Sequence, residues 1–207
     1  MTATAGKAAA ATSDSTSAHA GERRTIGGEA VVAGIGLHLG QPCRLTFRPA
    51  PTGTGIVFRR TDLAGSAPIP ARVEFAVDAE RRTQLGAGAE ALHTVEHVLA
   101  AVGALAIDDL EIGMDGPEPP ILDGSAAPFV FLIQSAGIEE QAAPKQFMRM
   151  RKELEVREGD KWARLTPFDG FRLSFSIEYD HPVLSRSGQE LIVDFAQTSY
   201  VREVARA

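Results

Sequence analysis

Hydrophobic positions recur along the chain with two periods, and each period predicts its own kind of element. In residues 43–47 every second position is Cys, Leu or Phe and the positions between are Arg and Thr, the pattern of a half-buried strand. The short apolar run 30–33 predicts a strand before it. Residues 56–59 predict a strand after it, paired with it as a hairpin through the segment 49–55, which is rich in Pro and Gly.

One stretch has the helical period instead. Its apolar residues form a single stripe: Val95, Val98, Leu99, Val102 and Leu105. Thr94 is predicted to cap the start of this helix. The opposite face holds Gly103 and three alanines where a surface helix would carry charge, so we expect the helix to be packed on both sides. Its only polar side chains, Glu96 and His97, lie in the first turn, at one edge of a buried element where a cleft can open.

The rest of the pattern predicts an α+β fold. A strand at 110–114 precedes a second helix at 128–135, which Gly137 ends. Further on, alternating residues predict a small antiparallel sheet with one apolar face, made of strands near 154–156, 162–165, 173–179 and 191–195. The only candidate to cover that face is the helical start at 199–207, so we expect a layer that is incomplete or completed by another chain.

Composition predicts where these units begin and end. Of the first twenty residues, 15 are Ala, Thr or Ser, and none is Leu, Ile, Val or Phe. Such a segment cannot bury enough surface to fold, so residues 1–23 are interpreted as a disordered tail. The polar stretch 138–144 ends in Pro and is interpreted as a domain boundary. The chain then divides into an N-terminal α+β domain, 24–143, and an incomplete second α+β domain, 144–207.

Charge and cysteine content exclude several classes of protein. A formal net charge of −6 and a pI near 5.4 argue against binding nucleic acid or anionic membrane by bulk charge. The single Cys43 excludes an intrachain disulfide and a Cys-rich metal site, and favours a reducing compartment. No run approaches the roughly 18 apolar residues of a membrane span. With no signal-peptide pattern either, we expect a cytoplasmic protein without a transmembrane segment.

One short motif suggests chemistry. His93, Glu96 and His97 spell H-x-x-E-H, which on a helix would place two imidazoles at i and i+4 beside a carboxylate. That pattern matches one class of zinc metalloproteases, which need a third ligand from elsewhere in the chain. The alternative is a pair of surface or capping histidines without a metal. The motif alone leaves both interpretations open.

Other polar residues have structural interpretations first. The glycines of 34–40 do not follow the phosphate-binding spacing, so this segment is predicted to be a turn between strands and His38 a structural residue. Asp123 could be a base, but Asp followed by Gly is typical of a turn. His181, between Asp and Pro, is interpreted as the end of a strand.

Several ordered motifs together carry a resemblance that none of them carries alone. They are Gly34-Ile35-Gly36-Leu37-His38, Thr83-Gln84-Leu85-Gly86, Thr94-Val95-Glu96-His97-Val98-Leu99-Ala100-Ala101, Gly116-Pro117-Glu118 leading into Pro120-Ile121-Leu122-Asp123-Gly124-Ser125-Ala126, and Tyr179-Asp180-His181-Pro182. In this order and spacing the chain closely resembles the UDP-3-O-acyl-N-acetylglucosamine deacetylases, the zinc amidases of lipid A biosynthesis. The resemblance extends from Thr25 to Ala207.

The resemblance implies a fold and a reaction. The family fold is two similar α+β domains in a sandwich, with the helices between two sheets and the active site at the domain interface. Glu96 matches the general base and His97 a zinc ligand of the family's T-V-E-H motif, while His93 lies outside it. The implied reaction is hydrolysis of the N-acetyl group of UDP-3-O-acyl-N-acetylglucosamine with Zn²⁺. Transient contact with a membrane or with the acyl chain is a further expectation.

Two departures from the family pattern matter. Arg82 stands where the family has a small residue near the metal, and a bulky cation there could crowd the metal or repel it. Family members also continue past Ala207 into helices that carry the other two zinc ligands, in an H-x-x-x-D arrangement, and a further catalytic His. His19, His38 and His181 offer no convincing substitute.

These departures lead to ranked hypotheses. We expect a fragment of a deacetylase that is inactive by itself. The alternative is a catalytically dead paralogue or binding module that uses the exposed sheet face. A metalloprotease is the more distant one.

Overall fold

A five-stranded sheet carries the first part of the chain in the computed structural model, which describes residues 21–77 and 80–206. Its order is β2-β3-β8-β4-β5, and all neighbours are antiparallel except β4 and β8. The strands are β2 (Ala30–Ile35), β3 (Pro42–Pro49), β8 (Leu110–Met114), β4 (Ile56–Arg60) and β5 (Ile69–Pro70). The alternation predicted for residues 43–47 is confirmed by β3, in which Cys43, Leu45 and Phe47 are buried.

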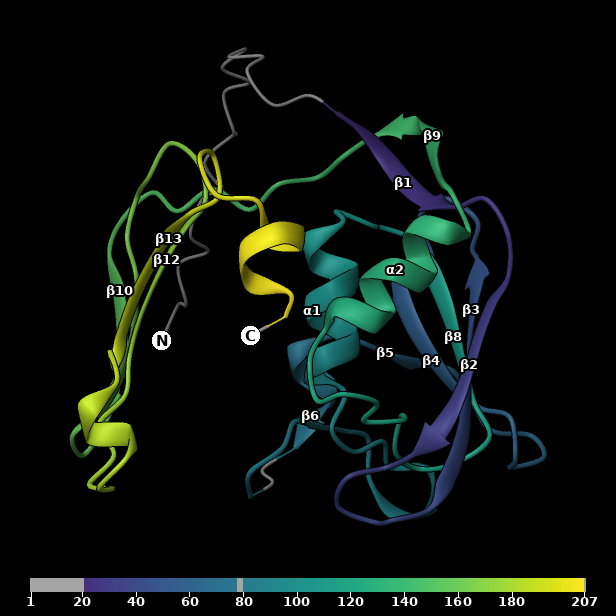
Figure 1. Ribbon diagram of the computed structural model, residues 1–207. Coiled ribbons are helices and arrows are strands. Elements are labelled where there is room, and N and C mark those ends of the chain that lie inside the picture. The colour runs from purple at the N-terminus through teal and green to yellow at the C-terminus, as the bar shows by residue number, and fades with distance from the viewer. Residues whose placement is uncertain (1–20, 78–79, 207) are drawn as a thin grey trace, which may run out of the picture.

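Two helices cover one face of this sheet (Figure 1). They are α1 (Glu96–Ala104) and α2 (Ala127–Ser135), which pack on each other and share one core with the sheet. Large, fully buried side chains of that core include Phe47, Phe58, Phe129, Leu45, Ile112 and Ile133. Burying such side chains supplies most of the driving force for folding. Both predicted helices are confirmed, and Gly137 follows α2 with a φ of 80° as a helix-ending glycine does.

The predicted hairpin of residues 43–47 with 56–59 is wrong, because β8 lies between β3 and β4. β4 pairs with β8 in parallel, Ile56 opposite Leu110 and Phe58 opposite Ile112. Parallel neighbours need a crossover connection, and the chain between the two strands supplies one that contains α1. Three of the five residues of β8, Leu110, Ile112 and Met114, have fully buried side chains, which explains why it takes the central position.

A second pairing joins the two ends of this unit. β1 (Glu22–Ile26) and β9 (Ile138–Pro144) form an antiparallel pair beside the main sheet. The boundary segment 138–144 is therefore a strand. The predicted tail extends two residues too far, because Glu22 and Arg23 belong to β1. Residues 1–20 of that tail lie outside the described residues. The division of the chain near residue 143 stays a prediction, and it coincides with the end of β9.

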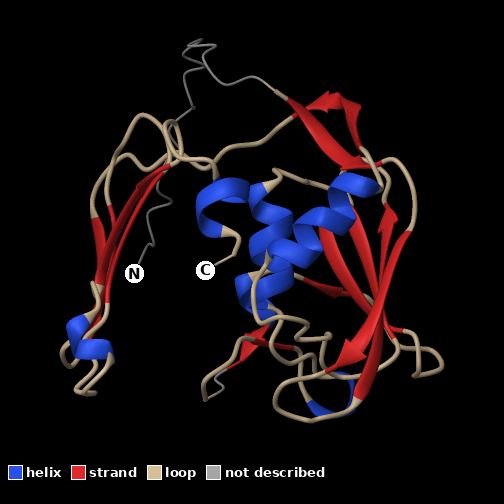
Figure 2. Ribbon diagram, viewed as in Figure 1, coloured by secondary structure: helices blue, strands red, loops and turns tan. Residues whose placement is uncertain are grey.

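The last part of the chain forms two antiparallel hairpins, as the alternating pattern predicts. They are β10 (Leu154–Glu158) with β11 (Lys161–Leu165), and β12 (Arg172–Ser176) with β13 (Glu190–Asp194). Figure 2 shows them on the far side of the helices from the five-stranded sheet. Apart from the buried Val193, their apolar side chains stay exposed, with Phe175 at 58%. Short pieces complete the fold: β6 (Ala76–Val77), β7 (Gln84–Leu85) and the helical turns Val73–Phe75, Gly88–Glu90, Leu184–Arg186 and Tyr200–Val204.

The architecture is a mixed α+β fold, as the sequence predicts. The prediction that α1 is packed on both sides holds only in part. Ala101 is buried, but Ala100, Gly103 and Ala104 are exposed on the face turned away from the sheet. The reason is that the final turn, Tyr200–Val204, packs on only part of this face. Domain duplication stays a prediction. None of the helices in the described residues is long and apolar enough to cross a membrane.

Candidate functional site

The first turn of α1 carries the two predicted site residues. The helix begins at Glu96, and Val95 precedes it without a capping side chain. The predicted cap at Thr94 is wrong, because this residue has a φ of 54° and its hydroxyl donates a hydrogen bond to Glu118 instead. His93 therefore lies before the helix, so H-x-x-E-H does not form the helical i, i+4 pair that a metalloprotease of this class needs.

The carboxylate of Glu96 is held by the segment that precedes β7. Its Oε2 accepts a hydrogen bond from the backbone N–H of Thr83 at 3.0 Å. Leu85 and Leu92 bond each other through both backbone groups, which ties that segment to the approach of α1. A carboxylate in the first helical turn is also stabilised by the helix dipole. Glu96 is thus oriented through Oε2, which leaves Oε1 available to a ligand.

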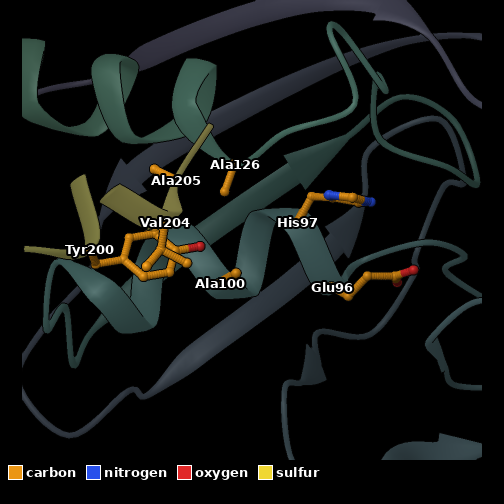
Figure 3. Close-up of a pocket in the computed structure, with 7 residues that line it drawn as sticks. All are labelled: Glu96, His97, Ala100, Ala126, Tyr200, Val204 and Ala205. Atoms are coloured by element: carbon orange, nitrogen blue, oxygen red, sulfur yellow. The ribbon is translucent and has the colours of Figure 1, made fainter. Parts of the chain in front are cut away.

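Glu96 and His97 border a cavity of about 290 Å³. The other lining residues come from α1, from the residue before α2 and from the last helical turn: Ala100, Ala126, Tyr200, Val204 and Ala205. Figure 3 shows Glu96 and His97 extending from the start of α1 away from the C-terminal residues. The two polar groups therefore stand at one end of a mainly apolar hollow, as a site that binds a partly apolar molecule requires.

His93 and Arg82 lie close to this site. Burial lowers the pKa of His93, and the positive charge of Arg82 lowers it further. His93 Nδ1 and Arg82 Nε are both buried without a hydrogen-bond partner among the described residues. Burial and the charge of Arg82 both favour the neutral imidazole of His93 over its protonated form. Whether Arg82 crowds a metal stays a prediction.

Glu118 stands in one of the quoted motifs, but the sequence alone predicts no role for it. Its side chain is 1% exposed. Burial raises its pKa, but hydrogen bonds from the Thr94 hydroxyl and from the backbone of His38 and Leu39 outweigh burial and hold the pKa below its usual value. Glu118 is therefore a buried, ionised acceptor. Periodicity could not reveal it, because it stands in a Pro-rich loop and its partners are remote in sequence.

The other candidates fall where their structural interpretations place them. His38 lies exposed on the turn between β2 and β3, which confirms the turn prediction. Asp123 accepts bonds from the backbone and hydroxyl of Ser125, as in a turn. His181 is exposed and its Nδ1 accepts the N–H of Val183, while His19 lies outside the described residues. Burial raises the pKa of the Cys43 thiol to about 12, so it remains protonated.

A metal site is not complete within residues 21–77 and 80–206. These residues contain no group of three or more His, Cys, Asp or Glu side chains that could hold a metal ion. A catalytic zinc ion needs three protein ligands. His97 can supply one of them, so the described residues fit part of such a site and not the whole.

Comparison with known proteins identifies the family. Residues 23–207 match the family described as UDP-3-O-acyl N-acetylglycosamine deacetylase (LpxC). Three curated relatives carry the name UDP-3-O-acyl-N-acetylglucosamine deacetylase. The one from Acidithiobacillus ferrooxidans is 55% identical over 174 residues, which cover 84% of this chain and 57% of the relative. Those from Pseudoalteromonas atlantica and Methylococcus capsulatus are 49% and 48% identical over 90% of this chain, and 62% and 61% of their own length.

The match covers most of this chain but a smaller share of each relative. The chain spans 57% to 62% of the length of these three proteins. Its T-V-E-H motif at the start of α1, the neighbouring Thr83 segment and the loop of Glu118 all lie within the matched residues 23–207. The chain therefore belongs to the UDP-3-O-acyl N-acetylglycosamine deacetylase family.

Proposed function

We propose that this chain is part of an enzyme that hydrolyses the N-acetyl group of UDP-3-O-acyl-N-acetylglucosamine in lipid A biosynthesis. One observation carries the proposal: Glu96 and His97 are adjacent on the first turn of α1 and border the same cavity, in a chain that belongs to a deacetylase family. Amide hydrolysis needs a base for the attacking water and an electrophile for the carbonyl. Glu96 can serve as the base, and His97 can help to hold a metal ion that would serve as the electrophile.

Glu96 is the proposed general base. Oε2 is engaged by the N–H of Thr83, which fixes the plane of the carboxylate. Oε1 is then left to take the proton of a water molecule, which it later gives to the leaving amine. The products are acetate and the free amine of the sugar. A bound and oriented carboxylate of this kind contributes about 100-fold or more to the rate.

His97 is the proposed ligand to a zinc ion. Zinc, when bound, polarises the acetamide carbonyl and makes water more acidic. The remaining ligands would come from outside the described residues, since these contain no group of three metal-binding side chains. The test uses a chain extended by the C-terminal part of a relative, as described below. In it we expect His97→Ala to lower the zinc content from about one ion per chain to near zero. His181→Ala, an exposed control, should leave the zinc content unchanged. Unchanged zinc content in His97→Ala would refute the ligand role.

The activity is tested with an extended chain, in which this sequence is continued by the C-terminal part of the Acidithiobacillus ferrooxidans relative. We expect release of acetate from UDP-3-O-acyl-N-acetylglucosamine by the extended chain and none by the 207-residue chain. An inactive extended chain that is folded would contradict the deacetylase proposal. Activity and zinc in the 207-residue chain would instead show that a local residue such as His93 completes the site.

A second candidate is a catalytically inactive binding module. The observation that favours it is the exposed apolar side of β12 and β13, where Leu173 is 45% exposed. Such a surface is typical of an interaction site. The same experiment separates the two, because a module would bind the enzyme or its nucleotide-sugar ligand and leave the extended chain inactive. A cytoplasmic location and transient contact with membrane or acyl chain stay part of the proposal.

A further inference from the structure

Glu118 joins two segments that are remote in sequence, one of which leads into α1. Its Oε1 accepts the hydroxyl of Thr94 at 2.6 Å, and both oxygens accept the N–H of His38 at 3.0 Å. Oε2 also accepts the N–H of Leu39 at 2.8 Å. A buried carboxylate costs free energy unless its oxygens are satisfied, and here donors from two sides satisfy them. The carboxylate therefore ties the turn after β2 to the residue two positions before Glu96.

The loop of Glu118 makes a second hydrogen bond to the segment that leads into α1. The N–H of His93 donates to the carbonyl oxygen of Pro117 at 2.9 Å. Residues 117–118 thus bond both residues of the pair 93–94, once through the backbone and once through a side chain. Two bonds to adjacent residues fix the direction of the chain as well as its position.

Thr94 needs such support. Its φ of 54° lies in the left-handed region, which is costly for a β-branched side chain. Such a conformation persists only where the surroundings determine it, and it occurs mainly at functional sites. Here the hydroxyl bond to Glu118 is the contact that determines it. The strained residue lies directly before the helix that carries the site.

The position of Glu118 is also fixed from the opposite side. A side chain on Gly36 would place its Cβ at 2.4 Å from Oε2 of Glu118, so only glycine allows the turn to approach this closely. Gly36 is buried, and its N–H donates to the carbonyl of Gln41. The carboxylate is therefore packed against a closed turn and has no room to shift.

We propose that Glu118 is a positioning residue: through Thr94 it sets the backbone turn that enters α1 and thereby the direction of Glu96 and His97. This inference rests on the proposed function, since it concerns the same site. A change at Thr94 would rotate the first turn of α1, and misplacement by about 1 Å is enough to lower a rate about 100-fold.

The test compares three substitutions in the extended chain. Thr94→Val removes the hydroxyl and keeps the shape, and Thr94→Ser keeps the hydroxyl. Thr25→Val is the matched control, because Thr25 is similarly buried and its hydroxyl accepts the N–H of Ala50, within the β1 region. We expect Thr94→Val to lower kcat about tenfold or more with KM within about twofold, and the other two to stay within about threefold of the parent.

A second measurement does not depend on activity. Hydrogen exchange of the His93 N–H in the 207-residue chain should become about tenfold faster in Thr94→Val and stay unchanged in Thr25→Val, because only the former loosens the segment 93–94. If Thr94→Val does not fold, Thr94→Ala, which is less strained at positive φ, is expected to show the same two changes.

The outcomes separate the two proposals. A folded extended parent without deacetylase activity overturns the proposed function, and the exchange rates still decide on Glu118. Unchanged exchange at His93 in Thr94→Val, or a kcat within about twofold of the parent, overturns the positioning role. An equal loss of kcat in Thr25→Val overturns it as well, because the effect would then be one of general stability.

Discussion

Glu96 is the residue on which the proposed reaction depends, and it can be changed without altering the shape of the site. Glu96→Gln keeps an oxygen that can accept the N–H of Thr83, so the local fold should persist, but it removes the base. We expect kcat of the extended chain to fall about 100-fold or more. The measurement is steady-state acetate release. Glu158→Gln, on exposed β10, is the control and should stay within about twofold; a drop of less than about fivefold in Glu96→Gln would rule out the base role.

Sequence reasoning found part of this site and missed the rest for a physical reason. Glu96 and His97 were predictable because they are polar residues at the end of an apolar helix and because they belong to a motif. A threonine before a helix usually caps it, so the sequence predicts a cap at Thr94. In the structure its hydroxyl donates a hydrogen bond to Glu118 instead. Glu118 and His38 are 80 residues apart. A contact over that distance has no periodic signal and becomes visible only in the folded chain.

Among the elements, β1 is joined to the start of β8 by a largely buried ion pair. Nε and an Nη of Arg23 bond both oxygens of Asp109 at 2.7 Å, and Asp109 also accepts the N–H of Gly55. The side chains are 15% and 0% exposed. Burial raises the pKa of Asp109, but the bonds from Arg23 and Gly55 outweigh it and the pKa is lowered overall. The pair therefore joins β1 to the start of β8 and to the loop before β4.

We expect Asp109→Asn to lower the free energy of unfolding at pH 7 by about 3 kcal/mol, since Arg23 would lose its partner in a mostly buried position. A lowered folded pKa means that the contribution is present above the unfolded value, about 3.9, and is lost as the pH falls through the folded value. Urea unfolding at pH 7 and near pH 3 should thus show a smaller difference at the lower pH. Glu140→Gln, which breaks an exposed pair with Arg24, should cost less than about 1 kcal/mol at either pH. An equal deficit for Asp109→Asn at both values would contradict the assignment.

The elements themselves were more predictable than their order. The period of the apolar residues located β3, β8, α1 and α2 to within a few residues, because that period reflects which face each element buries. The predicted neighbour of β4 is wrong because strands that follow each other in the sequence most often pair, whereas β8 enters the sheet through a crossover. β1 and β9 were missed because Glu22–Ile26 and Ile138–Pro144 are largely polar, and they pair at the edge of the fold where burial leaves little pattern.

On the scale of the whole molecule, the two parts of the chain differ in how they bury apolar surface. The five-stranded sheet, α1 and α2 form one core, whereas in β10 to β13, all of which the structure describes, only Val193 is buried. Phe175 and Leu191 are cross-strand partners and so share one face of the hairpin, at 58% and 52% exposure. Such a pair on a free sheet face is a binding surface for any apolar molecule.

The 207-residue chain should therefore bind the hydrophobic dye ANS, and the double substitution Phe175→Gln with Leu191→Gln should lower the dye fluorescence by about half, because it removes apolar area from the exposed face. Ser174→Gln with Ser176→Gln is the matched control, since these residues alternate with Phe175 and point to the opposite face. The control should leave the fluorescence unchanged. The extended chain should bind less dye than the 207-residue chain if its added part packs on this face. Equal dye binding by the double variant and its parent would show that the apolar pair is covered in solution.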